Sequence, residues 1–257
     1  MIFASVCIGS DRVTETLHLL NDIRNIDSKL FLLTDQNIDF NFYQFNNVVP
    51  IKTDNPWTDF ERFFAIKKAF EDTDSKYVYY VDSDSRFFNG RVEKYNEEKF
   101  LKLLDTIDFD IMSGWTLDPT KLQLEPPNLN ENKDIRNFKF GFDELLNYFK
   151  AKDSNFDNLK ELGTPLETVL IFKRSEKMLR YIDDLLYVRA LLIKEETKIE
   201  RKIKASACGF AMRMLQGAHN INIVQNKLVY HYFKGNFLRE VFPFNFRIEC
   251  HEKIYNE

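Results

Sequence analysis

Two aspartates lie two positions apart, directly after a continuous apolar run that extends from Lys76 to Val81. If the chain stays extended beyond this run, the carboxylates of Asp82 and Asp84 project to the same side. Two neighbouring carboxylates repel each other, and a divalent cation such as Mn²⁺ or Mg²⁺ offsets that repulsion through the oxygen ligands it prefers. The pattern therefore predicts a metal site at these two residues. The alternative is an aspartate-rich turn that only ends the strand.

The segments around this pair predict alternating strands and helices. Short apolar runs with β-branched and aromatic residues predict strands at 1–8, 29–34, 47–51, 76–81, 109–113, 168–172 and 228–233. Helical spacing of apolar residues predicts helices at 12–24, 97–106, 142–150, 175–202 and 207–216. Thr58 and Glu61 form a capping-box pattern, which predicts the start of a further helix. Apolar strands that alternate with helices indicate an α/β fold with a mostly parallel sheet covered on both faces.

An apolar strand followed by Asp-x-Asp at this depth resembles the metal motif of the GT-A glycosyltransferases, nucleotide-sugar enzymes with a Rossmann-like sheet. The resemblance covers the organisation of residues 1–115 and one C-terminal element. Arg62, on a helix ahead of Tyr79–Phe87, is similar to family 6 of that group. His231–Gly235 is similar to the late His-x-x-Gly-x-x-Lys signature of family 8, with Lys234 inside the interval.

This resemblance implies a metal-dependent transferase that moves a sugar, with retention of configuration, from a nucleotide-sugar to a carbohydrate or glycolipid acceptor. A UDP-sugar is the expected donor, and Mn²⁺ or Mg²⁺ is the expected cofactor. Asp82 and Asp84 would contact the metal or the ribose. His231 would be a third metal ligand, or alternatively a hydrogen-bonded packing residue. Lys234 would contact the diphosphate, where a basic group and a cation stabilise the charge that grows on the leaving group.

The donor nucleoside is expected beyond the ends of the first two strands, where ligands of such sheets bind. Glycine after the first strand permits close approach of the backbone, and polar groups follow the second strand. The helix ahead of the aspartates carries two basic residues that are placed to reach the phosphates. The alternatives are ordinary helix charges and a helix N-cap at 9–11. The predicted nucleotide-sugar-binding residues are Gly9, Ser10, Thr34, Asp35, Arg62, Lys67, Ser83 and Lys234.

Glu167 is the candidate catalytic carboxylate. It lies in Gly163–Thr168, downstream of the donor motif, where the resemblance to family 6 implies a glutamate on the acceptor side. The twin glycines of that family are absent here, and Ser206–Phe210 stands where the family has a later acidic cluster.

Size and composition favour one domain of 257 residues, with a nucleotide-sugar-binding half at 1–115 and a helical acceptor-side half at 116–257. The net charge of −4, with basic and acidic residues interspersed, argues against a nucleic-acid partner. No run reaches the roughly 18 apolar residues of a transmembrane helix. The three cysteines lie far apart and predict a reducing compartment, namely the cytosol, with or without contact to the inner membrane face.

Other classes of function start from the same residues. In an aspartyl-phosphate phosphatase, Asp82 would be the nucleophile, Asp84 the acid, and Asp183 with Asp184 the metal ligands. That motif normally follows the first strand of its domain, whereas several elements come first here. A nucleotidyltransferase also uses paired acids and a metal. A nucleotide-sugar-binding module without turnover is the non-catalytic alternative.

Overall fold

The computed structural model describes most of the first half of the chain and separate parts of the second half. The described residues are 2–24, 28–53, 56, 60–83, 85–87, 97–115, 148–152, 169–194, 208, 211, 212, 214–234 and 238–242. The strands in these ranges are β1 (Ile2–Cys7), β2 (Leu30–Thr34), β3 (Val48–Lys52), β4 (Tyr77–Val81), β5 (Ser85–Phe87), β6 (Ile111–Trp115), β7 (Val169–Lys173), β8 (Ile223–Lys234) and β9 (Leu238–Phe242). The longer helices are α1 (Val13–Ile23), α2 (Glu61–Glu71), α3 (Glu97–Asp105) and α6 (Glu176–Lys194), and a 3₁₀ turn, Ser10–Arg12, precedes α1.

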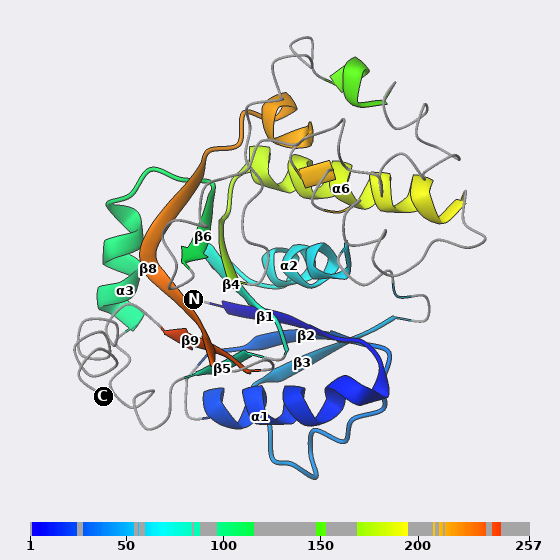
Figure 1. Cartoon of the computed structure of the whole chain (residues 1–257), viewed down its shortest axis with the longest axis vertical. Helices are drawn as coiled ribbons and strands as arrows, with labels where there is room; N and C mark the ends of the chain where they lie inside the picture. The colour runs from blue at the N-terminus through cyan, green and yellow to red at the C-terminus, as the bar shows by residue number, and fades with distance from the viewer. Residues whose placement is uncertain are drawn as a thin grey trace.

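All the described strands join one sheet, in the order β3-β2-β1-β4-β7-β6-β8-β9-β5 (Figure 1). The neighbouring strands β3, β2, β1 and β4 are parallel, β7 is antiparallel to both β4 and β6, and β8 is parallel to β6. The fold is therefore α/β and Rossmann-like, with a mostly parallel sheet, which confirms the predicted fold class. The second half supplies β7, β8 and β9 in addition to helices.

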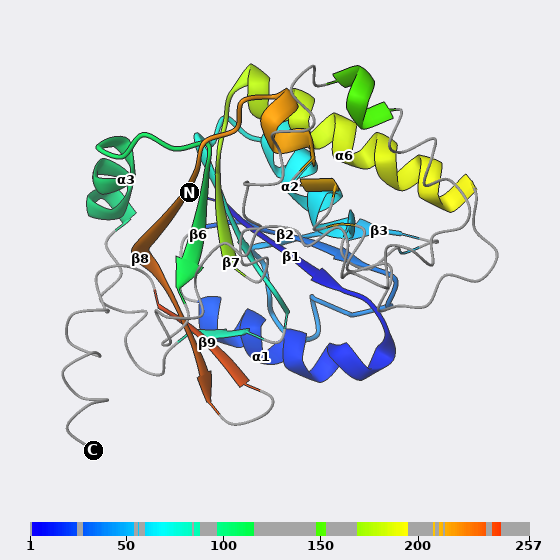
Figure 2. The same cartoon turned by 45° about the horizontal axis from the view of Figure 1, so that its top comes forward.

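Side chains of the strands alternate between two helical layers. On β4, Tyr77, Tyr79 and Val81 pack into the core under α1 and α3, whereas Val78 and Tyr80 pack into the core under α2 and α6. Figures 1 and 2 show α1 on one side of the sheet and α2 with α6 on the other. Both faces of the central strands are buried, which explains why these strands are apolar along their whole length.

The predicted helix forms and begins at Glu61, with Phe60 as its N-cap. Thr58, the other residue of the predicted capping box, lies outside the described residues. Glu61 is 1% exposed. Its Oε1 accepts hydrogen bonds from Arg189 Nε at 2.9 Å and Nη2 at 2.7 Å. This buried ion pair joins the first turn of α2 to α6.

Asp184 on α6 joins three segments of the second half. Its carboxylate lies 2.7 Å from His219 Nε2 and 2.9 Å from Lys152 Nζ. Burial opposes ionisation of Asp184, but the hydrogen bonds from Lys152 and His219 outweigh burial, so that its pKa lies below the ordinary carboxyl value. No helix in the described part of the chain is both long enough and apolar enough to cross a bilayer.

Replacing Asp184 with Asn is expected to reduce the acid sensitivity of the fold. Because the pKa of this carboxyl is lowered in the folded protein, its ionised form stabilises the fold above the ordinary value of 3.8, and that stabilisation is lost as the pH falls through the folded value. Asp184→Asn should cost about 1–3 kcal/mol near neutrality and progressively less in acid. Thermal unfolding of the variant and wild type between about pH 6 and pH 3 measures this difference.

The neighbouring exposed Asp183, which pairs with Lys67, provides the control. Asp183→Asn should change the free energy of unfolding by less than about 1 kcal/mol. Equal pH dependence in Asp184→Asn and wild type would contradict the prediction.

Candidate functional site

The strand order reverses its direction of growth at β1. From β1 the chain passes through α1 to β2 on one side, and from β3 it passes through α2 to β4 on the other side. In sheets of this kind, ligands bind at such a switch point, beyond the carboxyl ends of the strands. β1 and β2 remain paired up to Cys7 and Thr34, whereas the pairing of β1 with β4 ends at Ala4 and Tyr80. The residues that follow β1 and β4 are therefore the candidates for ligand contact.

The loop after β1 is tied to the loop after β2. Gly9 has φ 89° and ψ 145°, and its backbone N–H donates to Asp35 Oδ1 at 3.0 Å. Gln36 Nε2 donates to the same oxygen at 2.7 Å. The sequence grouped Gly9, Ser10 and Asp35 correctly in space, because consecutive parallel strands end at one edge. The contact also shows that the Asp35 carboxylate holds the shape of the Gly9 loop.

Thr34 lies at this edge but is fully buried. Its Oγ1 accepts a hydrogen bond from the backbone N–H of Gln36 at 3.0 Å. Lys52, at the end of β3, is a nearby cation that the sequence analysis did not single out. Its Nζ donates to the carbonyl oxygen of Gln36 and to Oδ1 of Asn37. In the sequence, the position of Lys52 at the end of an apolar strand is the only signal that could have indicated a residue of this edge.

Asp82 follows β4, as predicted, but the chain does not stay extended beyond it. The backbone N–H of Ser85 donates to the carbonyl oxygen of Asp82 at 3.0 Å, which closes a turn over these four residues. The predicted extended arrangement of this motif is therefore wrong. Ser83 is buried within the turn, and Asp84 lies outside the described residues.

Arg62, Tyr80 and Asp82 form a chain of contacts on the α2 face of the sheet. The guanidinium carbon of Arg62 lies 5.3 Å from the centre of the Tyr80 ring. The Tyr80 hydroxyl donates to Asp82 Oδ1 at 2.7 Å. Tyr80 is 3% exposed and Arg62 is 5% exposed. The predicted basic and acidic residues thus meet through a tyrosine that the sequence analysis had not assigned to the site.

Lys67 is not part of this chain of contacts. Its Nζ lies 2.6 Å from Asp183 Oδ1 and 3.7 Å from Glu71 Oε1. The hydrogen bond with Asp183 raises the pKa of Lys67. Lys67 lies more than one helical turn beyond Arg62 on α2, and in the structure it links α2 to α6.

The backbone of the late strands reaches the aspartate turn. β5 starts at Ser85 and pairs with β9, which pairs in turn with β8. The registers place Phe233 and Arg239 in one row with Ser85, and His231 in one row with Phe87. Pairing over more than 140 residues of sequence therefore brings the segment that carries His231 and Lys234 within two strands of the motif, although the side chains of both residues lie outside the described part.

The metal prediction can be compared with the structure only at Asp82. A half-buried carboxylate at a strand end, with one oxygen held by a tyrosine hydroxyl, fits a ligand of Mn²⁺ or Mg²⁺. Among the described residues, no three His, Cys, Asp or Glu side chains gather into a possible metal site. The other predicted ligands, Asp84 and the side chain of His231, lie outside the described residues.

The candidate catalytic Glu167 also lies outside the described residues. The strand that follows it, β7, starts at Val169, which is paired with Val81 at the end of β4.

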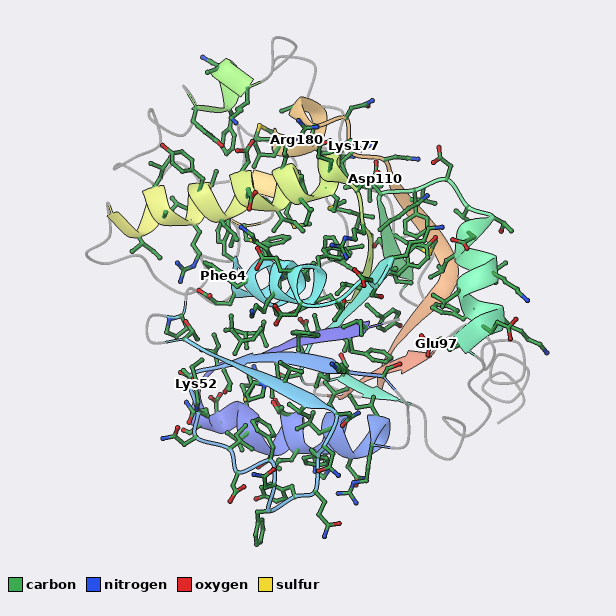
Figure 3. The ribbon with its side chains drawn as sticks, turned by 180° about the vertical axis from the view of Figure 1, so that it is seen from behind. Lys52, Phe64, Glu97, Asp110, Lys177 and Arg180 are labelled. Atoms are coloured by element: carbon green, nitrogen blue, oxygen red, sulfur yellow. The ribbon has the colours of Figure 1, made fainter. Side chains whose placement is uncertain are left out.

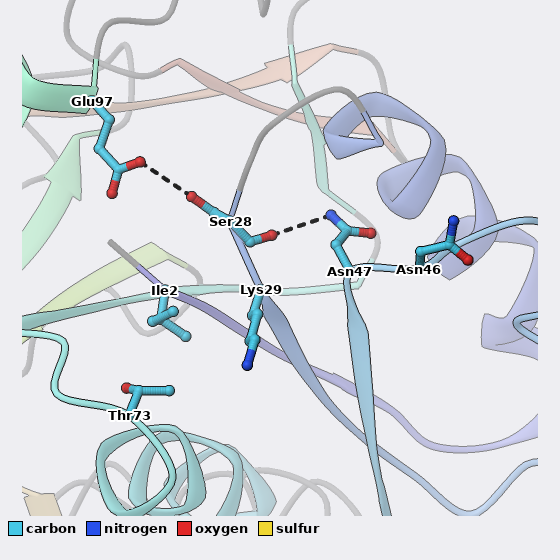
Figure 4. Close-up of a pocket in the computed structure, with 7 residues that line it drawn as sticks. All are labelled: Ile2, Ser28, Lys29, Asn46, Asn47, Thr73 and Glu97. Carbon is cyan, nitrogen blue, oxygen red and sulfur yellow. Dashed lines mark hydrogen bonds between the residues drawn. The ribbon is translucent and has the colours of Figure 1, made fainter.

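A hollow of about 660 Å³ lies at the opposite edge of the sheet, where the strands begin (Figure 4). Ser28 Oγ donates to Glu97 Oε2 at 3.4 Å, and Asn47 Nδ2 donates to the Ser28 carbonyl at 3.2 Å. Figure 3 shows Lys52 and Glu97 on opposite sides of the molecule, which separates the two edges. The hollow is therefore distinct from the switch-point site. It is lined by Ile2, Ser28, Lys29, Asn46, Asn47, Thr73 and Glu97.

No protein-family model matches the chain, and no curated protein matches it. Among solved structures, it is similar to TarS from S. aureus, with 13% identity and a TM-score of 0.42, over 95% of this chain and 60% of that one. It is similar to the glycosyltransferase GlyE of Streptococcus pneumoniae TIGR4, with 13% identity and a TM-score of 0.45, over 88% of this chain and 45% of that one.

A third similar structure is CMP:2-keto-3-deoxy-manno-octonic acid synthetase complexed with CTP, with 11% identity and a TM-score of 0.46, over 98% of this chain and 95% of that one. The chain spans 60% of the TarS chain, which comprises residues 1–349 of that protein, and 45% of the GlyE chain. Likenesses of this strength do not decide an activity.

Replacing Gly9 with Ala is expected to destabilise the switch-point loop. A φ of 89° is unfavourable for residues with a Cβ, and a Cβ built at this position lies 2.6 Å from Asp11 Oδ1. The backbone strain alone should cost about 1–3 kcal/mol, measured as a change in the free energy of unfolding. Adding Asp11→Ala removes the clash and should leave most of the loss in place. Gly217 has no positive φ, so Gly217→Ala is the control for a glycine without this backbone strain. Full recovery of the free energy of unfolding in the double variant would contradict the backbone explanation.

Proposed function

We propose that this chain is a glycosyltransferase that takes a sugar from a nucleotide-sugar and transfers it to an acceptor, with Mn²⁺ or Mg²⁺ held at Asp82 and Asp84. The observation that carries the proposal is the position of Asp82. It follows β4 directly across the switch point from the Gly9 and Asp35 loops. A long anionic ligand can contact both sets of residues there, with its nucleoside near Gly9 and its diphosphate near Asp82.

The charges of the site suit a nucleoside diphosphate. A carboxylate repels a diphosphate, so Asp82 would favour that ligand only through a bound cation, which would neutralise the phosphates and stabilise the leaving group. Arg62 adds a buried positive charge on the same face as Asp82. The close backbone approach at Gly9 suits the nucleoside, and Asp35 holds that loop in shape. A UDP-sugar is the proposed donor.

The second half of the chain supplies the remaining parts of the proposal. β8 and β9 carry Lys234 and His231 toward the aspartate turn, where Lys234 would bind the diphosphate and His231 the metal. Glu167 is the proposed catalytic carboxylate, because the strand that follows it starts opposite the end of β4. Retention of configuration and a carbohydrate or glycolipid acceptor rest on the resemblance of the sequence motifs.

The phosphatase alternative gains no support from its own metal ligands. It requires Asp183 and Asp184 to hold the metal with Asp82. Asp183 pairs with Lys67, and Asp184 pairs with Lys152 and His219. Carboxylates with these partners hold segments of the fold together, and a metal would have to displace them.

Isothermal titration of nucleotides tests the donor site. With Mn²⁺ present, one of UDP, GDP, CDP and ADP should bind wild type, and chelation should abolish binding. Asp82→Asn is expected to weaken metal-dependent binding by about 10–100-fold or more, because an amide oxygen is a poorer ligand for a hard cation than a carboxylate. Asp108→Asn, an exposed aspartate at the opposite edge, is the matched control and should bind as wild type does.

If none of these diphosphates binds to folded wild type with Mn²⁺, the glycosyltransferase proposal is wrong. Release of the diphosphate from the corresponding nucleotide-sugar in the presence of an acceptor panel then separates a transferase from a binding module. Release of pyrophosphate from a nucleoside triphosphate would instead indicate nucleotidyl transfer.

A further inference from the structure

Tyr80 contacts two charged groups of the proposed donor site, Arg62 and Asp82. Its ring lies 5.3 Å from the guanidinium carbon of Arg62, and its hydroxyl donates to Asp82 Oδ1 at 2.7 Å. The ring is 3% exposed and belongs to β4, which is paired on both sides by β1 and β7. The Tyr80 side chain packs in the core cluster with residues of α2 and α6, so the surrounding side chains restrict its movement.

We propose that Tyr80 is a two-sided positioning residue, whose hydroxyl orients the Asp82 carboxylate toward the metal and whose ring places the Arg62 guanidinium near the phosphates. The inference rests on the proposed function and deepens it. It concerns a residue that would touch neither metal nor nucleotide and would act through the two that do.

The hydroxyl has a defined effect on Asp82. The terminal torsion of an aspartate is broad, so the carboxylate plane turns easily unless a hydrogen bond restrains it. Asp82 also opens a turn, where the backbone no longer follows the regular geometry of β4. The bond from Tyr80 restrains one oxygen and so fixes the direction of the other. Hydrogen bonds of this type to metal ligands typically change metal affinity by about 10–100-fold.

The ring has a separate effect on Arg62. A planar guanidinium stacks on an aromatic face, and the attraction strengthens when water is excluded. Arg62 is almost fully buried, so its side chain lies in an environment that strengthens this contact. Loss of the ring would remove this contact with the Arg62 guanidinium, whereas loss of the hydroxyl alone would leave the contact in place. The two contacts can therefore be separated by substitution.

Tyr79 is the matched control. It is the preceding residue of the same strand, is equally buried, and faces the opposite helical layer, where its ring makes an edge contact with Phe3. Tyr79→Phe and Tyr80→Phe remove the same atom from neighbouring buried tyrosines. General loosening of β4 would affect both variants, whereas loss of the Asp82 contact affects only Tyr80→Phe.

The test measures two affinities for each variant by isothermal titration. The probes are Mn²⁺ and the tightest-binding diphosphate among UDP, GDP, CDP and ADP. Tyr80→Phe should raise the half-saturating Mn²⁺ concentration by about 10–100-fold, with the diphosphate affinity at saturating Mn²⁺ within about threefold of wild type. Tyr80→Leu removes the ring as well and should weaken both affinities. Tyr79→Phe should leave both within about twofold of wild type.

Arg62→Lys provides a second, independent variant, because lysine keeps the charge and loses the planar stack. It should weaken the diphosphate affinity by about tenfold or more, with little change in the half-saturating Mn²⁺ concentration. If wild type binds and Tyr80→Phe matches Tyr79→Phe in Mn²⁺ dependence, the positioning role is overturned while the proposed function stands. If folded wild type binds neither probe, both proposals fail together.

Discussion

The position of β1 between β2 and β4 is the constraint on which the rest of the structure depends. Parallel strands are connected by crossovers, which are almost always right-handed. The crossover through α1 moves outward from β1 to β2, and the crossover through α2 moves back from β3 to β4, so the two helices must lie on opposite faces of the sheet. This explains why α1 and α2 lie in different layers. It also explains why the loops after β1 and β4 face each other without a strand between them. The position of the candidate site is thus a consequence of strand order, and the side chains at that edge of the sheet determine what it can bind.

Buried charge pairs fix how the helix with Arg62 meets the second half of the chain. The side chains of Arg189 and Glu61 are 13% and 1% exposed, so their attraction acts in a low-dielectric environment and offsets much of the cost of removing both charges from water. The pair joins the first turn of α2 directly to α6. Lys67 and Asp183 add an exposed link further along the same two helices. The first turn of α2 therefore has a defined position at the sheet edge.

The sequence predicted those features that depend on local pattern. β1, β2 and β4 are continuous apolar runs, and their order with the intervening helices was sufficient to predict the sheet and the edge at which Gly9, Asp35 and Asp82 lie. β5 and β9 were missed, because a three-residue strand has no periodicity and its pairing with β9 depends on residues far along the chain. The contact between Arg189 and the Glu61 carboxylate was missed for the same kind of reason, because it joins residues far apart in the sequence. Tyr80 looked like any other aromatic of a buried strand.

The turn at Asp82 links the central sheet to the late strands, and this changes how the motif must be understood. An extended Asp-x-Asp would orient two carboxylates by alternation alone. Here the chain reverses at Asp82 and continues into β5, which pairs with β9. The orientation of Asp82 must then come from side-chain contacts, and one of these is the hydrogen bond from Tyr80. The position of the late strands depends on the same turn, because Ser85 both closes it and starts the ladder to β9. The orientation of Asp82 and the approach of the C-terminal segment are therefore coupled through the four residues of this turn.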